Sequence, residues 1–300
     1  MVTAGYKRPK LSLQKKLFII AGITGPILSF LVFWLAMNFT GLFTAFQVTG
    51  SDGVKLGFDN FKFVIDELRN PMSTLRGGFK NTFIFFFFNL LVQIPVCYAM
   101  SFFMYKKIFG HNVFRYIFFL PCIISAVVMT AFVKFMLAPG GPLPVVWGKL
   151  FGVEPLFLQD SRYAMPTLLV YGLWSGFGIN LILYTASFNR IPQELVEAGK
   201  LDGLGLWQEV WHIVFPLTWP FFSTMLMLSF TGIFSASGPI LLFTQGDYDT
   251  MTISFWIYQK TMTGAQTGLA AALGWLLTVI SFPLVLLVRK LADKVEPIEY

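Results

Sequence analysis

Residues 81–105 read NTFIFFFFNLLVQIPVCYAMSFFMY and contain no charged side chain. An α-helix needs about 20 consecutive apolar residues to cross the hydrocarbon core of a bilayer, which is roughly 30 Å thick. This stretch is long enough and apolar enough to form such a helix. It therefore predicts a membrane-spanning segment.

The composition of the whole chain agrees with this segment. Hydrophobic residues make up 56% of the 300 residues and charged residues only 12%, and the mean hydropathy is +0.68. Soluble domains contain about 25% charged residues, because their surface must face water. A chain with half that share cannot cover a globule of this size, so the composition predicts an all-α, polytopic membrane protein.

Six segments are apolar enough to be membrane spans. They begin and end near the following residues: Leu17 to Phe39, Asn81 to Tyr105, Tyr116 to Val133 with an extension to Leu137, Tyr163 to Asn189, Ile213 to Gly246, and Thr261 to Val288. Each contains at least one proline, which neighbouring helices and water make tolerable at this depth. We therefore expect six transmembrane helices, some of them bent.

Basic residues predict the orientation in the membrane. Five of them and no acid precede the first span, namely Lys7, Arg8, Lys10, Lys15 and Lys16. An excess of lysine and arginine marks the cytoplasmic side, so residues 1–16 are expected to be a cytoplasmic tail. Six spans return the C-terminus, with Arg289, Lys290 and Lys294, to the same side. The pattern predicts a multi-pass membrane protein with both termini in the cytoplasm, and with its basic residues beside lipid and not on nucleic acid.

The spans lack the residues that other membrane functions need. Lys134 is the one charged candidate within them, near the outer end of the third span, where its stem could snorkel to the interface. Proton-driven transporters generally need an ionisable group deep in the bilayer, which disfavours that class. The sequence also has no G-x-x-x-x-G-K-[ST] loop for nucleotide, so the energy is expected to come from elsewhere.

Enzyme and metal signatures are missing as well. His111 and His212 are far apart and have no partners at metal-ligand spacing, and Cys97 and Cys122 lie in apolar runs. No H-E-x-x-H or G-x-S-x-G motif occurs. We therefore expect no metal, no cofactor and no catalytic residue in this chain. A polytopic membrane enzyme and a secondary transporter or channel remain the alternatives.

The loop between the fourth and fifth spans carries the most specific pattern. Residues 190–220 read RIPQELVEAGKLDGLGLWQEVWHIVFPLTWP. Pro192 suits a first helical position, and Gly199 and the Asp202–Gly203 pair are typical of a helix end. The sequence predicts a short helix, a turn and a second helix. A solvated connector is the alternative reading of this pattern.

This loop resembles the signature of the permease subunits of binding-protein-dependent ABC importers. That signature is EAA, three residues, Gly, nine residues, then I-x-L-P. Here Glu197, Ala198 and Gly199 are followed at the same spacings by Gly203, and by a last group that runs from Ile213 to Pro216. Three positions depart from the pattern: Gly199, expected to loosen the helix end, Leu204 and Phe215.

Further segments resemble the sugar-uptake branch of that family, the maltose, glycerol-phosphate and oligosaccharide type. They are 57–61, Asn81–Thr82, Lys106–Lys107 and 114–121. The resemblance implies the type I permease fold over residues 17–300, with residues 190–216 as a coupling loop. Its ATPase-coupling residues would be Glu197, Ala198, Gly199, Asp202, Gly203, Ile213 and Pro216.

The resemblance also implies a place in the bacterial cytoplasmic (inner) membrane, and it implies partners. These are a second homologous permease, separate ATPase subunits that bind ATP and magnesium, and an extracytoplasmic solute-binding protein that delivers a sugar. By the same resemblance the pore follows the fourth and fifth spans, which offer these candidates for the substrate path: Trp174, Ser175, Gly176, Phe177 and Asn180, then Ser229, Phe230 and Thr231. Aromatic rings and neutral hydrogen-bonding groups suit a neutral sugar. Packing between helices is the alternative role for each of them.

Overall fold

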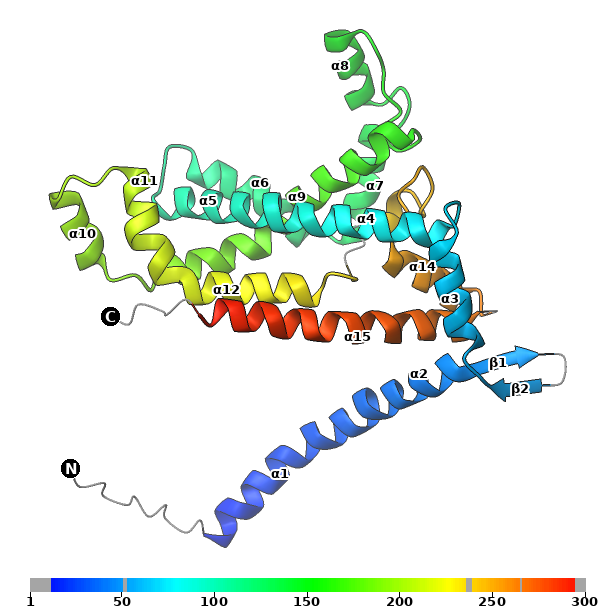
Figure 1. Ribbon diagram of the computed structural model, residues 1–300. Coiled ribbons are helices and arrows are strands. Elements are labelled where there is room, and N and C mark those ends of the chain that lie inside the picture. The colour runs from blue at the N-terminus through cyan, green and yellow to red at the C-terminus, as the bar shows by residue number, and fades with distance from the viewer. Residues whose placement is uncertain (1–11, 51–52, 236–238, 265, 295–300) are drawn as a thin grey trace.

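The computed structural model describes residues 12–50, 53–235, 239–264 and 266–294 (Figure 1). Six helical stretches of this part are long and apolar enough to cross a membrane. The second, fourth, fifth and sixth of these stretches run side by side, and the short helices α10 (Gln193–Leu201) and α11 (Leu206–Glu209) lie together at one end of the bundle. The all-α, six-span architecture predicted from the sequence is confirmed.

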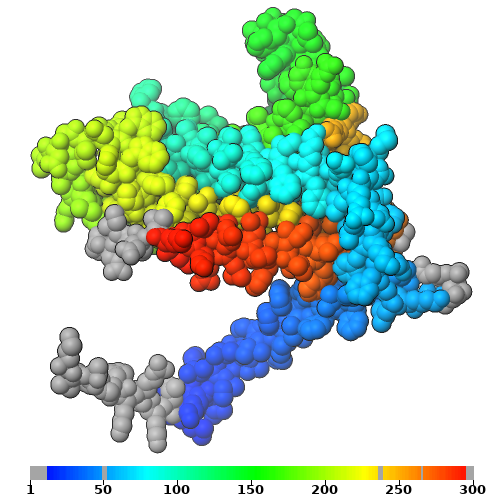
Figure 2. Space-filling model, in the orientation of Figure 1, coloured from blue at the N-terminus to red at the C-terminus, as the bar shows by residue number. Residues whose placement is uncertain are grey.

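The first span is a single helix over 13–46, made of α1 (Leu13–Ser29), the π-helical segment η1 (Phe30–Ala36) and α2 (Met37–Phe46). It begins before the predicted Leu17 because the Ser12 hydroxyl accepts a hydrogen bond from the Lys15 N–H and caps the helix. Lys15 and Lys16 therefore lie in the helix and not in a tail, and the other predicted basic residues, Lys7, Arg8 and Lys10, lie outside the described residues. No residue of α1 or η1 is buried, and Figure 2 shows the N-terminal part of this helix standing apart from the bundle, whereas α2 packs against the last helix of the chain, α15 (Thr267–Ala292).

A β-hairpin and a short helix follow the first span and were not predicted. The strands β1 (Gln47–Gly50) and β2 (Gly53–Leu56) pair antiparallel, and α3 (Asp59–Arg69) packs against α2 and α15. The Asn60 amide donates to the carbonyl oxygens of Ala45 and Gln47 at 3.0 and 2.8 Å. These bonds fix α3 at the end of the first span.

The second span covers 74–105 and is made of α4 (Thr74–Phe88), η2 (Asn89–Gln93) and α5 (Ile94–Tyr105). Its charge-free part is the predicted segment, and Ser73 caps the additional turns by accepting from the Leu75 N–H at 3.1 Å. The helix thus extends beyond the hydrocarbon layer at the end that carries Arg76 and Lys80.

The third crossing consists of two helices, α6 (His111–Ile123) and α7 (Ala126–Leu137), separated at Ile124–Ser125. Together they include the predicted span from Tyr116 to Leu137, and they run along the bundle away from α10 (Figure 1). The stretch selected by length and hydropathy alone is 126–151, which joins α7 to α8 (Pro142–Phe151). The turn at 138–141 separates those two helices and α8 extends outside the bundle, so we assign the crossing to α6 and α7.

The fourth span, α9 (Ser161–Phe188), matches the prediction. The fifth does not: α11 (Leu206–Glu209), η3 (Val210–Val214) and α12 (Phe215–Thr231) form one helix that begins before Ile213 and ends well before Gly246. The chain then turns into α13 (Ile240–Phe243) and α14 (Ile253–Met262). No charged residue occurs between Thr231 and Gly246, so the sequence does not mark the end of the span.

The sixth span, α15 (Thr267–Ala292), begins later than the predicted Thr261, which belongs to α14. Between α13 and α14 the backbone is left-handed at Gln245, Gly246, Tyr248 and Asp249. The Asn81 amide holds this segment by donating to the carbonyl oxygens of Asp249 and Met251, each at 2.8 Å. This buried asparagine explains why a polar residue opens the charge-free run of the second span.

The main packing centre lies at the α10 end of the bundle. We call it the loop-end cluster, and its buried members are Cys97, Tyr98, Phe102, Phe177, Tyr184, Phe188, Ile191, Val196 and Val214. The Tyr98 ring meets those of Tyr184 and Phe188 edge-on at 5.4 and 5.1 Å. Such pairs contribute about 0.5–1.5 kcal/mol each beyond burial. This matters in lipid, where close packing and not the exclusion of water holds helices together.

The six crossings predict that both termini lie on the same side of the membrane as α10. Reporter fusions to the N-terminus and to Tyr300 are expected to report the cytoplasm, because five basic residues lie before the first span or in its first turn and an even number of crossings follows. A fusion after Gly152, at the end of α8, is expected to report the outside. A terminal fusion that reports the outside, or a Gly152 fusion that reports the cytoplasm, would contradict this topology.

Candidate functional site

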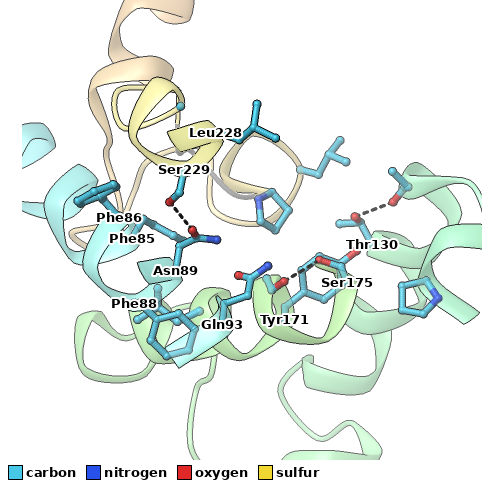
Figure 3. Close-up of a pocket in the computed structure, with 17 residues that line it drawn as sticks. Phe85, Phe86, Phe88, Asn89, Gln93, Thr130, Tyr171, Ser175, Leu228 and Ser229 are labelled. Carbon is cyan, nitrogen blue, oxygen red and sulfur yellow. Dashed lines mark hydrogen bonds between the residues drawn. The ribbon is translucent and has the colours of Figure 1, made fainter. Parts of the chain in front are cut away.

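A cavity of about 550 Å³ lies among the second, third, fourth and fifth spans. Figure 3 shows Asn89 and Gln93 from η2, Thr130 from α7, Tyr171 and Ser175 from α9 and Ser229 from α12 around it. Phe85, Phe86 and Phe88 add aromatic surface. The residues come from four separate spans, so the packing of the bundle creates the cavity.

The π-helical segment η2 follows from the proline that comes after it. The N–H of Ile94 bonds to the carbonyl oxygen of Asn89, five residues back. Pro95 has no N–H to offer the carbonyl of Leu91, and its ring would crowd that carbonyl in a regular α-helix. The backbone widens into a π-turn, a feature frequent at functional sites. Asn89 and Gln93 thereby reach the cavity from one turn.

One hydrogen bond joins two walls of the cavity. The Ser229 hydroxyl on α12 donates to the side-chain oxygen of Asn89 at 2.7 Å (Figure 3). The hydroxyls of Ser175 and Thr130 donate to their own helices, to the carbonyl oxygens of Gly172 and Ala126 at 3.2 and 2.7 Å. Their remaining lone pairs can accept hydrogen bonds from a ligand.

Gly176 makes room for the second amide of the cavity. A Cβ atom at this position would lie 2.1 Å from the Gln93 side-chain nitrogen. The glycine therefore allows α9 and η2 to approach closely while Gln93 stays between them. Small residues serve this purpose in membrane helices.

The chemistry of the cavity is neutral. None of its described lining residues carries a charge, and its polar groups are amides and hydroxyls beside aromatic rings. A few placed polar groups on an otherwise apolar surface are typical of small-molecule sites. Among the residues that the structure describes, no three histidine, cysteine or acidic side chains are grouped to hold a metal ion. This donor set suits an uncharged ligand rich in hydroxyl groups.

Of the residues predicted for the substrate path, Ser175 and Ser229 line this cavity. Gly176 lies beside it, in contact with Gln93. The other candidates in α9 make packing contacts: the Trp174 indole donates to the Ile117 carbonyl oxygen at 3.1 Å, Phe177 stacks on Phe118 at 4.3 Å, and Asn180 donates to the Gly176 carbonyl oxygen at 2.9 Å.

The other two candidates lie on α12. Phe230 packs edge-on against Phe86 at 5.0 Å, and Thr231 lines a separate, smaller cavity of about 290 Å³. The polar lining residues that were not predicted from the sequence are Asn89, Gln93, Thr130 and Tyr171. Two amides four residues apart in an otherwise apolar span were a signal that could have identified Asn89 and Gln93.

The predicted coupling loop, residues 190–216, includes α10 (Gln193–Leu201), which ends in a two-bond turn, and also the start of the fifth span. The loop proper is residues 190–205, which precede α11, and the name coupling loop is kept for these residues. The N–H groups of Gly203 and Leu204 bond back to the carbonyl oxygens of Lys200 and Gly199 at 3.1 and 3.0 Å. This is a Schellman motif, which requires a left-handed residue after the helix. Gly203 provides it with a φ of +80°. Its absent side chain would meet nothing within 4 Å, so backbone conformation and not a clash selects glycine.

Gly199 was expected to loosen the end of the short helix. In the structure it instead fits tightly against its neighbours. It is buried, and a Cβ atom there would lie 2.7 Å from the Ile213 Cδ1 and 2.9 Å from the Leu204 Cδ1. The two departures from the family pattern, Gly199 and Leu204, therefore compensate each other. Ile213 lies in η3, and Pro216, two residues after that π-helix, repeats the arrangement of η2 and Pro95.

The outer face of α10 is free of contacts with the bundle. Val196 is buried in the loop-end cluster, whereas Glu197, Ala198 and Asp202 are exposed. Leu201 beside them is 90% exposed. A short helix held on one face and exposed with an apolar tip on the other is suited to seat in a partner.

The helix after the loop is joined to the second span by polar contacts. Lys106, at the end of α5, forms a buried ion pair with Glu209 of α11. Further along, the hydroxyls of Tyr98 and Thr218 are hydrogen-bonded at 2.8 Å. The Lys106 ammonium also lies over the Phe102 ring, 5.6 Å from its centre. The loop, α5 and α12 thus form one packed unit.

Comparison with known proteins identifies the family. Residues 2–297 match the family described as "Binding-protein-dependent transport system inner membrane component". The chain is 26% identical to the arabinooligosaccharides transport system permease protein AraP of Bacillus subtilis, over 89% of this chain and 85% of AraP. It is 29% identical to the probable ABC transporter permease protein YurN of the same organism, over 59% of this chain and 62% of YurN, so it spans less than two thirds of that relative.

A solved structure has the same fold. A chain of a bacterial ABC transporter involved in the import of the acidic polysaccharide alginate superposes with a TM-score of 0.80, at 23% identity, over 94% of this chain and 97% of that chain. The helical architecture and the sequence match agree. This multi-pass membrane protein belongs to the family of inner membrane components of binding-protein-dependent transport systems.

Proposed function

We propose that this chain is the pore-forming permease subunit of an ATP-driven importer of sugars or oligosaccharides. Two features carry the proposal. The fifth span lines a charge-free cavity, and the loop that leads into this span carries the exposed helix α10. A transport family member needs both a path and a source of energy. The cavity would form part of the path, and the loop would receive the energy from a partner.

The energy is proposed to come from separate ATPase subunits that bind ATP and magnesium. The exposed face of α10, with Glu197, Ala198 and Asp202, would seat in a cleft of the ATPase. The rigid turn at Gly203 keeps α10 at a fixed angle to α11. Because α11, η3 and α12 are one continuous helix, a force on the loop reaches Ser229 without crossing a flexible linker.

The first span supports a second permease as a partner. Its residues from Leu13 to Ala36 are unburied in this chain and stand apart from the bundle (Figure 2). A homologous subunit beside it would enclose the path between two halves. Rocking of the two halves would then open the cavity to each side in turn, with a solute-binding protein delivering the sugar on the side opposite α10.

The substrate class is proposed from the cavity. Amides, hydroxyls and aromatic rings without a charge suit a neutral sugar, whose hydroxyl groups both donate and accept hydrogen bonds. The relative AraP is named for arabinooligosaccharides, which supports a carbohydrate. The volume of about 550 Å³ lies within the usual range for small-molecule sites.

Filling the cavity is expected to stop transport without preventing assembly. Ser175→Trp and Ser229→Trp each add a ring to its wall, and uptake of labelled sugar should fall to background in cells that carry the whole system. Complex yield should stay close to that of the unmodified chain, because the ring has empty volume to enter. Ile179→Trp, at an exposed position of the same α9 helix, is the matched control and should transport normally.

A different result would follow if these serines only pack between helices. Overpacking then costs roughly 1–3 kcal/mol, and the amount of complex would fall together with uptake. Normal uptake by both variants at normal yield would remove the cavity from the path.

Changes in the coupling loop are expected to separate ATP hydrolysis from transport. Gly203→Ala places a side chain at a φ of +80°, which costs about 1–2 kcal/mol, and Glu197→Lys reverses a charge on the docking face. Both should lower substrate-stimulated ATPase activity in the reconstituted complex, or the yield of ATPase subunit on the permease. Asp293→Lys, an exposed reversal at the same end of the bundle outside the loop, should leave both values unchanged. Unchanged values for both loop variants would refute the docking role.

A further inference from the structure

The second and fifth spans are connected by three polar pairs at regular intervals. In order from the loop to the cavity they are Lys106 with Glu209, Tyr98 with Thr218, and Asn89 with Ser229. Along one span the numbers fall while along the other they rise, as expected for antiparallel neighbours. The first pair lies at the coupling loop and the last pair forms part of the cavity wall.

Only one of the two spans is continuous with the loop. The helix α11–η3–α12 follows the loop directly, so any displacement of α10 is carried along it. The span α4–η2–α5 does not run into the loop, because its end at Tyr105 is followed by α6. It meets the loop and the start of the fifth span through the apolar loop-end cluster, and its charged contact with α11 is the ion pair between Lys106 and Glu209.

The burial of this pair makes it a firm connection. The side chains of Lys106 and Glu209 are only 16% and 6% exposed. Removing one partner from such a pair leaves a buried charge without compensation, which is strongly unfavourable. The two helix ends are therefore held together for as long as both charges are present, whereas a solvated ion pair would separate readily.

We infer that Lys106 and Glu209 are positioning residues whose ion pair makes the second span follow the coupling loop, so that both walls of the cavity move together. Displacement of α10 shifts α11, and Glu209 draws Lys106 and α5 with it. Because η2 and α5 belong to one continuous helix, Asn89 and Gln93 keep their places opposite Ser229. The inference rests on the proposed function of the loop.

The test follows each wall of the cavity separately. In a chain with Cys97→Ala and Cys122→Ala, single cysteines are placed at Gln93 on η2 or at Leu228 on α12, which both line the cavity. Neither change touches the hydrogen bond between Asn89 and Ser229. The whole complex is purified through this chain, and the rate of labelling by a maleimide is measured with and without a non-hydrolysable ATP analogue and magnesium.

With the ion pair intact, nucleotide is expected to change the labelling rate at both positions. In Glu209→Gln and in Lys106→Met, the change at Gln93→Cys should be lost while that at Leu228→Cys remains, because α12 is still continuous with the loop. Sugar transported per ATP hydrolysed should fall by roughly fivefold or more, the lower end of the range for coupling between two sites. Lys106→Arg, which keeps the charge, should restore both readouts.

Two further variants separate this role from a purely structural one. Lys107→Met removes a neighbouring exposed charge and should behave as the parent. Glu209→Asp keeps the carboxylate but withdraws it, and should reduce the change at Gln93→Cys even if Glu209→Gln does not assemble. Persistence of the nucleotide-dependent change at Gln93→Cys in the assembled pair variants, or its loss at both positions together, would overturn the inference. No change at either position with the ion pair intact would instead refute the proposed function of the loop.

Discussion

The structure depends on one constraint: within hydrocarbon, each polar group of the chain must find its partner inside the protein. The second span shows how this is met. Its asparagine and tyrosine side chains bond to hydroxyls of the fifth span, and Asn81 bonds to the turn before α14. Interhelical hydrogen bonds of this kind contribute about 0.6–2 kcal/mol each. They specify which helices are neighbours and at what register, which apolar surfaces alone would not.

Two prolines shape the functional parts of this scaffold, because each follows a π-helical segment that alters the course of its span. Pro95 and Pro216 each follow a π-helical segment by two residues. One segment aims Asn89 and Gln93 into the cavity, and the other lies directly after the coupling loop. Two glycines determine the conformation of the loop. Gly203 adopts a left-handed backbone, and Gly199 allows close packing. The same spans therefore carry a neutral site at their centre and a rigid attachment at one end.

Much of this could be predicted from the sequence, because charge-free runs and basic flanks are direct consequences of the bilayer. The end of the fifth span and the start of the sixth could not, since no charged residue occurs between Thr231 and Gly246 or between Thr261 and Thr267. The break between α6 and α7 and the β-hairpin were also missed. The motif from Glu197 to Pro216 located the loop, whereas the pairing of Asn89 with Ser229 depends on contacts between distant segments that no local pattern contains. Ser175 and Ser229 were named, but their neighbours in the cavity were not.

We propose that this chain works only as part of an assembly driven by a separate ATPase. The most direct measurement is purification of the chain from its own cell membranes in mild detergent, with identification of the copurifying proteins and assay of ATP hydrolysis. We expect an ATPase subunit and a second permease to copurify, and the ATPase activity to rise when the solute-binding protein and its sugar are added. Recovery of the chain intact and folded, without any ATPase, would contradict the claim.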